Sequence, residues 1–214
     1  MFWKHFFTFE LEYFDSYLQL IERSIQSDWQ KLKAEEETMK KAGIKPILDD
    51  FGRPFDPYDV LADEAHHTHR PEQLMLMSFV MSIFAFTEYN LNRICKIIQN
   101  EQKSLFSYKD LHGSGISKAK KYIDTIYDTN FPTDTNLQSD LRVLVIVRNC
   151  LTHNDGVIKK NDVAEINSYL KCNPEFFEVD NLRRLRLKVE YARHLIDFVK
   201  KIQKELESVV KALN

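Results

Sequence analysis

The sequence is poor in the residues that mark β-rich and disulfide-built proteins. Its 214 residues include 5 glycines and 6 prolines, too few for the many tight turns of an all-β fold, so the composition favours long helices. The three cysteines, Cys95, Cys150 and Cys172, show no CxxC spacing. We therefore expect reduced thiols that pack between helices rather than a disulfide framework or a cysteine-rich metal site.

Excess charge and long apolar runs are also missing. The formal net charge is −2, which gives no general attraction to nucleic acid and leaves any such binding to local patches. No run of 18 apolar residues is present, so no membrane-spanning helix is expected. Lys4, Glu10 and Glu12 interrupt the aromatic N-terminal segment, which excludes a secretory signal. These features predict a cytoplasmic protein that does not bind a membrane.

The chain length and the hydrophobic spacing predict one all-α domain over residues 1–214. Residues 1–43 carry apolar side chains at helical spacing and end in a charged stretch before Gly43, which is typical of a long N-terminal helix. Residues 44–70 contain three prolines and Gly52 and are predicted to form a surface excursion. Residues 71–214 are predicted to form the core bundle.

Within the bundle, Pro71 is expected at the first position of a central helix that is apolar on nearly every side. Further helices are predicted over residues 116–128, from residue 135, over residues 161–172 and over residues 187–212, with a loop over residues 173–181. The result is an up-and-down bundle of about five to six helices.

The stretch VLVIV, residues 143–147, is ambiguous by periodicity. Its β-branched side chains suit a buried strand. The flanking residues extend it to nearly twenty positions without a turn signal, a length typical of a buried helix. We therefore predict a helix here.

Three polar residues follow this apolar stretch: Arg148, Asn149 and His153. Asn149 and His153 are four apart and share a helix face, whereas Arg148 and His153 are five apart, about 140° around an ideal helix. The two side chains can converge if the long arginine stem reaches around the helix, if the helix ends near His153, or if a second copy of the chain supplies the other half of the site. Two interpretations stay open: a functional site, or a capped helix end in which His153 favours the dipole and Arg148 pairs with Glu88.

Other polar clusters carry weaker signals. His66, His67 and His69 have partly helical spacing but no further ligands that would complete a metal site, so we expect a solvated surface and no metal. Two basic clusters, Lys118, Lys120 and Lys121 in one segment and Arg183, Arg184, Arg186 and Lys188 in another, could contact phosphates or form charged surfaces.

The sequence VRNCLTHNDG resembles the signature of the HEPN superfamily of helical domains, in which a polar residue follows an arginine directly and a histidine follows it after four to six positions. Arg148, Asn149 and His153 match this pattern. From about residue 72 to the C-terminus, the order of segments also resembles HEPN-like proteins of bacterial stress, toxin and phage-defence systems. The first seventy residues match only as a preceding helix.

The resemblance implies a HEPN-type bundle that pairs through its motif helices into a homodimer, bringing two Arg/His sets together. Many members are metal-independent endoribonucleases, including toxins and abortive-infection proteins, while others are non-catalytic binding or assembly modules. It implies RNA as the partner, with an antitoxin or another protein as a further partner, and no cofactor. Arg148, Asn149 and His153 then become the candidate catalytic residues, with Glu88 and Asn154 as supporting residues.

The chemistry of these residues fits RNA cleavage. A 2′-hydroxyl can attack the adjacent phosphate when one group removes its proton and another protonates the leaving 5′-oxygen. A histidine such as His153 can take either part, and the planar fork of Arg148 suits phosphoryl oxygens. Asn149 would orient the histidine or a phosphate. Because the nucleophile belongs to the substrate, no metal is required.

Overall fold

The computed structural model describes the backbone of residues 3–42, 47–48, 54–55, 57–102, 107–113 and 115–211, and the side chains of residues 10–42, 70–100, 107–113 and 115–208. The helices in these ranges are α1 (Trp3–Ala42), α2 (Pro57–Gln102), α3 (Gly115–Tyr127), α4 (Thr135–His153), α5 (Val163–Cys172) and α6 (Val189–Lys211), with short 3-10 helices η1 (Tyr108–Asp110) and η2 (Lys160–Asp162). The prediction of an all-α bundle with a long N-terminal helix is confirmed.

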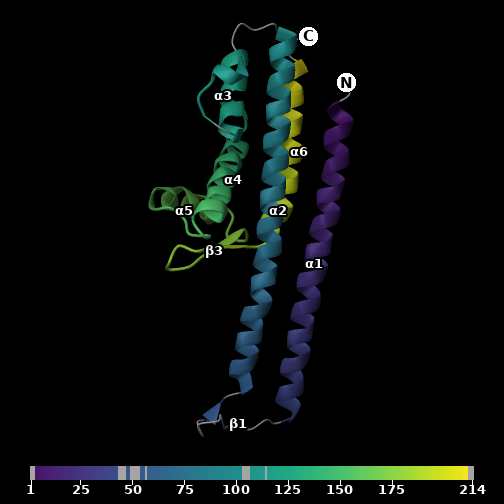
Figure 1. Cartoon of the computed structure of the whole chain (residues 1–214), viewed down its shortest axis with the longest axis vertical. Helices are drawn as coiled ribbons and strands as arrows, with labels where there is room; N and C mark the ends of the chain where they lie inside the picture. Colours follow the sequence, from purple (N-terminus) through teal and green to yellow (C-terminus); the bar gives the residue numbers. More distant parts are fainter. Residues whose placement is uncertain are drawn as a thin grey trace.

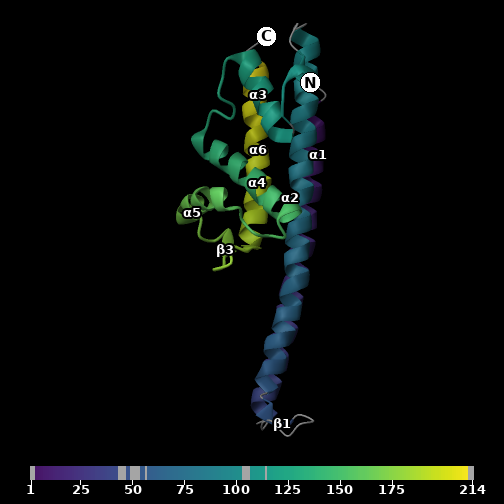
Figure 2. The same cartoon turned by 60° about the vertical axis from the view of Figure 1, so that its left-hand side comes forward.

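The molecule is a helical bundle with a long two-helix extension (Figure 1). Helices α1 and α2 run side by side, α6 lies along one half of this pair, and α3 and α4 lie on another side of α2 in the same half (Figures 1 and 2). A helix rises 1.5 Å per residue, so the 46 residues of α2 span about 69 Å and the 23 residues of α6 only about 35 Å. The C-terminal end of α1 and the N-terminal end of α2 therefore extend beyond the bundle (Figure 1).

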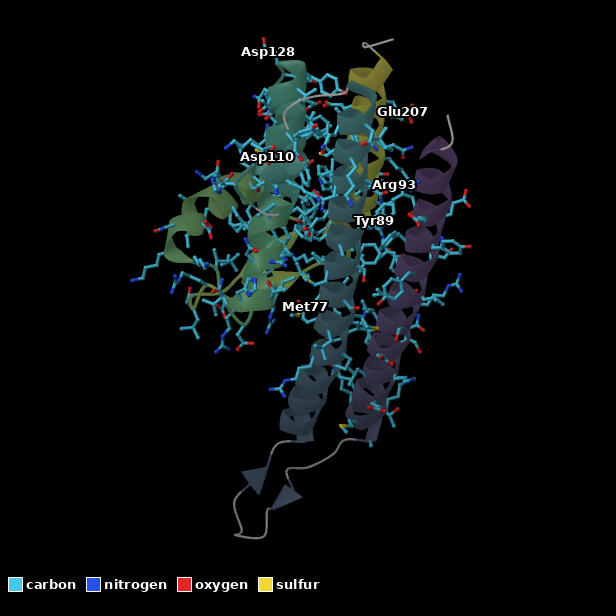
Figure 3. All side chains as sticks on the ribbon, turned by 45° about the horizontal axis from the view of Figure 1, so that its top comes forward. Met77, Tyr89, Arg93, Asp110, Asp128 and Glu207 are labelled. Carbon is cyan, nitrogen blue, oxygen red and sulfur yellow. The ribbon has the colours of Figure 1, made fainter. Side chains whose placement is uncertain are left out.

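Helix α2 supplies the centre of the core. Leu76, Phe79, Val80 and Ile83 are fully buried on it, and α1, α3, α4 and α6 all contact it. The ring of Phe14 from α1 lies 5.8 Å from that of Phe79, in an edge-to-face arrangement that aromatic rings favour. Side chains of α2 fill the space toward α1 on one side and toward α3 and α4 on the other (Figure 3).

The predicted start of the second helix was wrong. Helix α2 begins at Pro57 and continues through Pro71, so residues 57–70 are helical and the predicted surface excursion is shorter than expected. Proline has a helical φ and is favoured at the first position of a helix. In the sequence, Pro57 and Pro71 are equally good candidates for that first position. Contacts on both sides hold the helix past Pro71: Trp29 Nε1 donates to Glu72 Oε2 over 3.3 Å, and Gln73 exchanges two 2.9 Å hydrogen bonds with the backbone of Leu187.

Between α1 and α2, strand β1 (Ile47–Leu48) pairs antiparallel with β2 (Pro54–Phe55). The side chains of His66, His67 and His69 lie outside the described residues, although their backbone belongs to α2. The prediction of a solvated histidine cluster therefore stays a prediction, because these side chains lie outside the described residues.

A second hairpin replaces the loop predicted over residues 173–181. Strand β3 (Phe177–Val179) pairs antiparallel with β4 (Leu185–Leu187), and α6 starts at Val189 rather than at residue 187. Leu185 and Leu187 are buried while Arg186 between them is exposed, so β4 has the alternation of a half-buried strand. The segment was missed because three residues are too few for a periodic signal, and because Leu187 continues smoothly into the helical pattern that follows.

By length and composition alone, the stretch Arg70–Asn100 within α2 is apolar enough to cross a membrane, and 44% of that window is buried inside the molecule. The sequence prediction of no such helix counted only uninterrupted apolar runs. A core helix meets the same criterion, and α2 is the helix on which the other long helices pack.

The three cysteines differ in accessibility. Cys95 and Cys150 are buried, as the sequence predicts, and Cys172 is exposed; none of them forms a disulfide. Burial raises the pKa of the Cys95 thiol to about 12 and that of the Cys150 thiol to about 11. Because the thiolate is the reactive form, both buried thiols are expected to be inert.

We therefore expect one thiol of the native protein to react quickly with a chromogenic disulfide reagent at pH 8, and the other two only after unfolding in guanidinium chloride. Cys172→Ser serves as the control and removes the fast phase. Three fast thiols in the native protein would contradict the burial of Cys95 and Cys150.

Candidate functional site

Helix α4 carries the motif and begins with a well-formed cap. The Asp134 side chain accepts hydrogen bonds from the backbone N–H groups of Asn136 and Leu137, over 2.7 and 3.3 Å, which satisfies amides that would otherwise be unpaired at a helix start. Along α4 the buried apolar residues are Leu137, Leu141, Val143, Leu144, Val147 and Cys150. The helix predicted for VLVIV is confirmed, because tertiary burial outweighs β-propensity.

Helix α4 ends at the motif turn, residues 154–156. The backbone N–H groups of Asn154 and Gly156 both donate to the carbonyl of Cys150, over 3.2 and 3.1 Å. Asp155 and Gly156 have φ of 50° and 75°, the left-handed conformation in which helices commonly end and which Gly and Asp tolerate best. His153 is therefore the last helical residue, and its side chain is exposed.

The structure brings the three motif side chains together within one chain. Arg148 Nη1 donates to Asn149 Oδ1 over 3.0 Å and lies 3.1 Å from His153 Nε2. The long arginine stem thus closes the five-residue offset without a second copy. Since arginine has only donors, His153 Nε2 must accept in this arrangement, which places the ring proton on Nδ1.

The arginine is held but incompletely bonded. Its guanidinium carbon lies 5.2 Å from the centre of the Phe84 ring of α2, within range of a cation–π contact. Its Nε is buried and has no hydrogen-bond partner among the described residues, and leaving a buried donor unpaired costs about 1–3 kcal/mol. Arg148 therefore retains donor capacity for a ligand with several acceptor oxygens.

The two predicted supporting residues are close to the motif without joining its side-chain contacts. Asn154 Nδ2 donates to the backbone carbonyl of Asn149 over 3.3 Å, so Asn154 stabilises the helix end. Glu88 is half-buried on α2, and its Oε1 would lie 3.2 Å from a Cβ built on Gly115. No ion pair joins Glu88 to Arg148 in the described parts of the chain. The interpretation of Arg148 as a partner of Glu88 is therefore not supported.

Glu88 instead faces the first residue of α3. Gly115 starts this helix with φ of 62°, where only glycine avoids strain. A carboxylate at a helix N-terminus is favoured by the helix dipole and by the unpaired N–H groups there. Glu88 therefore lies where its charge would favour the start of α3.

The position of Glu88 against Gly115 can be tested by comparing substitutions at two glycines. Gly115→Ala and Gly156→Ala each place a side chain at positive φ, which costs about 1–2 kcal/mol, but only the Cβ at position 115 meets Glu88, while nothing lies within 4 Å of a Cβ at position 156. We expect Gly115→Ala to lower the free energy of unfolding in urea more than Gly156→Ala does. Adding Glu88→Ala should reduce the excess; equal losses for both glycines would contradict the contact.

A second polar cluster lies elsewhere on α4, and the sequence did not indicate it. A cavity of about 570 Å³ is bordered by Asp140, Tyr169 and His194. Tyr169 Oη donates to Asp140 Oδ1 over 2.6 Å, and His194 Nε2 lies 3.1 Å from Asp140 Oδ2, at an angle that does not make a hydrogen bond. Burial, together with the hydrogen bond to Asp140, raises the pKa of Tyr169.

Asp140 and Arg148 are eight residues apart on α4, about 12 Å along its axis, so the cluster is separate from the motif. Its three side chains come from α4, α5 and α6, and their contacts link these helices. A buried carboxylate needs such partners, and we assign the cluster a structural role.

Comparison with known proteins adds no family name to this geometry. No protein-family model, no curated protein and no solved structure matches the chain.

Proposed function

We propose that the chain is a metal-independent endoribonuclease of HEPN type. The observation that supports the proposal is the contact between Arg148 Nη1 and His153 Nε2, 3.1 Å apart, at the exposed end of a buried helix. An arginine beside a histidine offers a phosphate-binding cation and a proton-transfer group at one place. His153 is exposed and is not needed to pack the core there.

The proposed reaction is a transesterification within RNA. The 2′-oxygen forms a bond to the adjacent phosphorus while the bond from phosphorus to the 5′-oxygen breaks, leaving a 2′,3′-cyclic phosphate and a 5′-hydroxyl. One imidazole takes the proton of the 2′-hydroxyl, and a second acid gives a proton to the 5′-oxygen. The requirement for the 2′-hydroxyl makes RNA, and not DNA, the substrate.

Arg148 and His153 would change partners when RNA binds. In the free chain the guanidinium occupies His153 Nε2, so the imidazole cannot accept a substrate proton at that nitrogen. Phosphoryl oxygens are stronger acceptors for the arginine fork than a neutral imidazole. Their arrival would draw Arg148 Nη1 away from His153 and free Nε2; in the free chain the same nitrogen also donates to Asn149 Oδ1.

A homodimer through the motif helix would supply the second proton-transfer group. Arg142, Val145, Ile146 and Asn149 form the less buried side of α4, and Val145 and Ile146 are apolar and only half-buried. Both border a hollow of about 250 Å³ between α3, α4 and α5 that is lined by apolar and charged side chains. Apolar surface next to a site is typical of an interface core, and a two-fold axis there would place two His153 side chains near each other.

We expect the protein, of 25.4 kDa per chain, to have twice that mass by light scattering coupled to size exclusion. Ile146→Asp places a charge in the proposed interface and should yield monomers with RNA cleavage reduced together with dimerisation. Leu182→Asp, at a large apolar side chain that is 63% exposed, is the control and should remain dimeric. A monomeric unmodified protein that cleaves RNA would contradict the composite site.

The catalytic assignment is tested with purified protein and mixed RNA in the presence of EDTA. General acid–base groups contribute about 10²- to 10⁴-fold, so His153→Ala should lower the cleavage rate by about that factor. Arg148→Ala should lower it about 10²- to 10³-fold, as removal of a transition-state donor does. Equal cleavage by His153→Ala and the unmodified protein, or a strict need for a divalent metal, would overturn the mechanism.

The alternative is a non-catalytic HEPN module that binds RNA, a nucleotide or a protein partner. The net charge of −2 and the occupation of His153 Nε2 by Arg148 favour this alternative. It predicts binding without turnover, which Arg148→Ala abolishes. The resemblance also supports a place in bacterial stress or phage defence for both alternatives, as a toxin or abortive-infection protein controlled in the cytoplasm by an antitoxin or another protein.

A further inference from the structure

The basic cluster of residues 183–188 lies directly beside the motif turn, although about thirty residues separate the two in the sequence. The N–H of Leu185 donates to the carbonyl of Gly156 over 2.9 Å, and the N–H of Ile158 donates to the carbonyl of Arg183 over 2.9 Å. Val157 and Arg184 form an antiparallel bridge. Strand β4 is thus joined to the chain that leaves His153, and Figure 1 shows the hairpin at the C-terminal end of α4.

Arg183 fixes this junction and is not free for a ligand. Its Nη1 donates to the carbonyl of Ile158 over 3.1 Å, and its backbone has φ of 63°. The turn before it is also held, because Asp180 Oδ1 accepts from the N–H groups of Leu182 and Arg184, both over 2.8 Å. The position of β4 relative to His153 is therefore set by several hydrogen bonds.

Arg184 and Arg186 are both exposed and point to the side of β4 opposite its buried leucines. In the described part of the chain neither forms an ion pair. Two carboxylates of the hairpin have other partners: Glu178, opposite Arg186 in the sheet, pairs with Lys188 over 3.1 Å, and Asp180 accepts from backbone N–H groups of the turn. The two arginines, which we name the basic strip, are exposed cations on a hairpin that several hydrogen bonds hold in place.

The basic strip is close to the proposed reaction centre. Gly156 is three positions after His153, and three steps along the chain span at most about 11 Å. Gly156 is hydrogen-bonded to Leu185, the residue between the two arginines. Side chains two apart on a strand lie on the same face, about 7 Å from each other, so the strip presents two guanidinium groups in a row beside the motif turn.

We propose that Arg184 and Arg186 bind the phosphates of single-stranded RNA next to the bond to be cleaved. This inference rests on the proposed function and adds to it the path of the substrate over the β3–β4 hairpin. Arginine forks bind phosphate oxygens in pairs, and such contacts position a strand without reading its sequence. They also explain how a chain with a net charge of −2 could hold RNA, since binding depends on a local patch.

The test measures binding and its dependence on salt. The probe is a fluorescein-labelled single strand of about 20 nucleotides with 2′-O-methyl groups throughout, which lacks the nucleophile and stays intact. Each phosphate contact to a single strand contributes about 0.7 to the slope of log affinity against log salt. Arg184→Gln with Arg186→Gln should therefore weaken binding and reduce that slope by about 1.4, and Arg184→Lys with Arg186→Lys should restore most of it.

The matched control is Lys201→Gln with Lys204→Gln, which removes the same charge from exposed positions on α6 and should change the slope little. Suppose that the unmodified protein binds and cleaves RNA, and that Arg184→Gln with Arg186→Gln has the same salt slope as the unmodified protein and as the lysine control. The inference that the basic strip binds RNA is then wrong, and the proposed function stands. If the unmodified protein neither binds nor cleaves RNA, both fail. Tighter binding of polyglutamate than of RNA, lost in Arg184→Gln with Arg186→Gln, would overturn the inference in favour of an acidic protein partner.

Discussion

Burial of the apolar side chains of α2 holds the other long helices of the bundle in place. Leu76, Phe79, Val80 and Ile83 are fully buried, and α1, α3, α4 and α6 each contact this helix. Burying one such side chain contributes about 1.5–3 kcal/mol, so the positions of α4 and of its terminal residues depend on how it packs against α2. The ring centre of Phe84, the residue after Ile83, lies 5.2 Å from the guanidinium carbon of Arg148.

This packing gives the two ends of α4 different properties. At its start, Asp134 caps the helix and Asp140 is buried with Tyr169, so that end is tied into the bundle. At its end, the motif turn stops the helix and leaves His153 exposed. The same turn receives the β3–β4 hairpin, so His153, Arg148 beside it and the exposed Arg184 and Arg186 lie in one region of the molecule.

Most helices could be predicted because their apolar residues repeat over many positions. Helix α3 and helix α5 fall within about two residues of the predicted ranges, and the length of the VLVIV segment correctly favoured a helix. The start of α2 was not predictable, because a proline at a first position and a proline tolerated inside a helix have the same local pattern. The β3–β4 hairpin and the Asp140 cluster depend on residues far apart in the sequence, for which no periodic signal exists.

The sequence alone determined the class of fold, the buried character of the motif helix and the identity of Arg148, Asn149 and His153 as a unit, because hydrophobic periodicity and a short motif are local properties. Only the tertiary structure decided that Arg148 contacts His153 within one chain, that Glu88 faces α3, and that Arg184 and Arg186 lie beside the motif turn. These contacts depend on the reach of side chains and on hydrogen bonds between distant segments, which helical spacing does not specify.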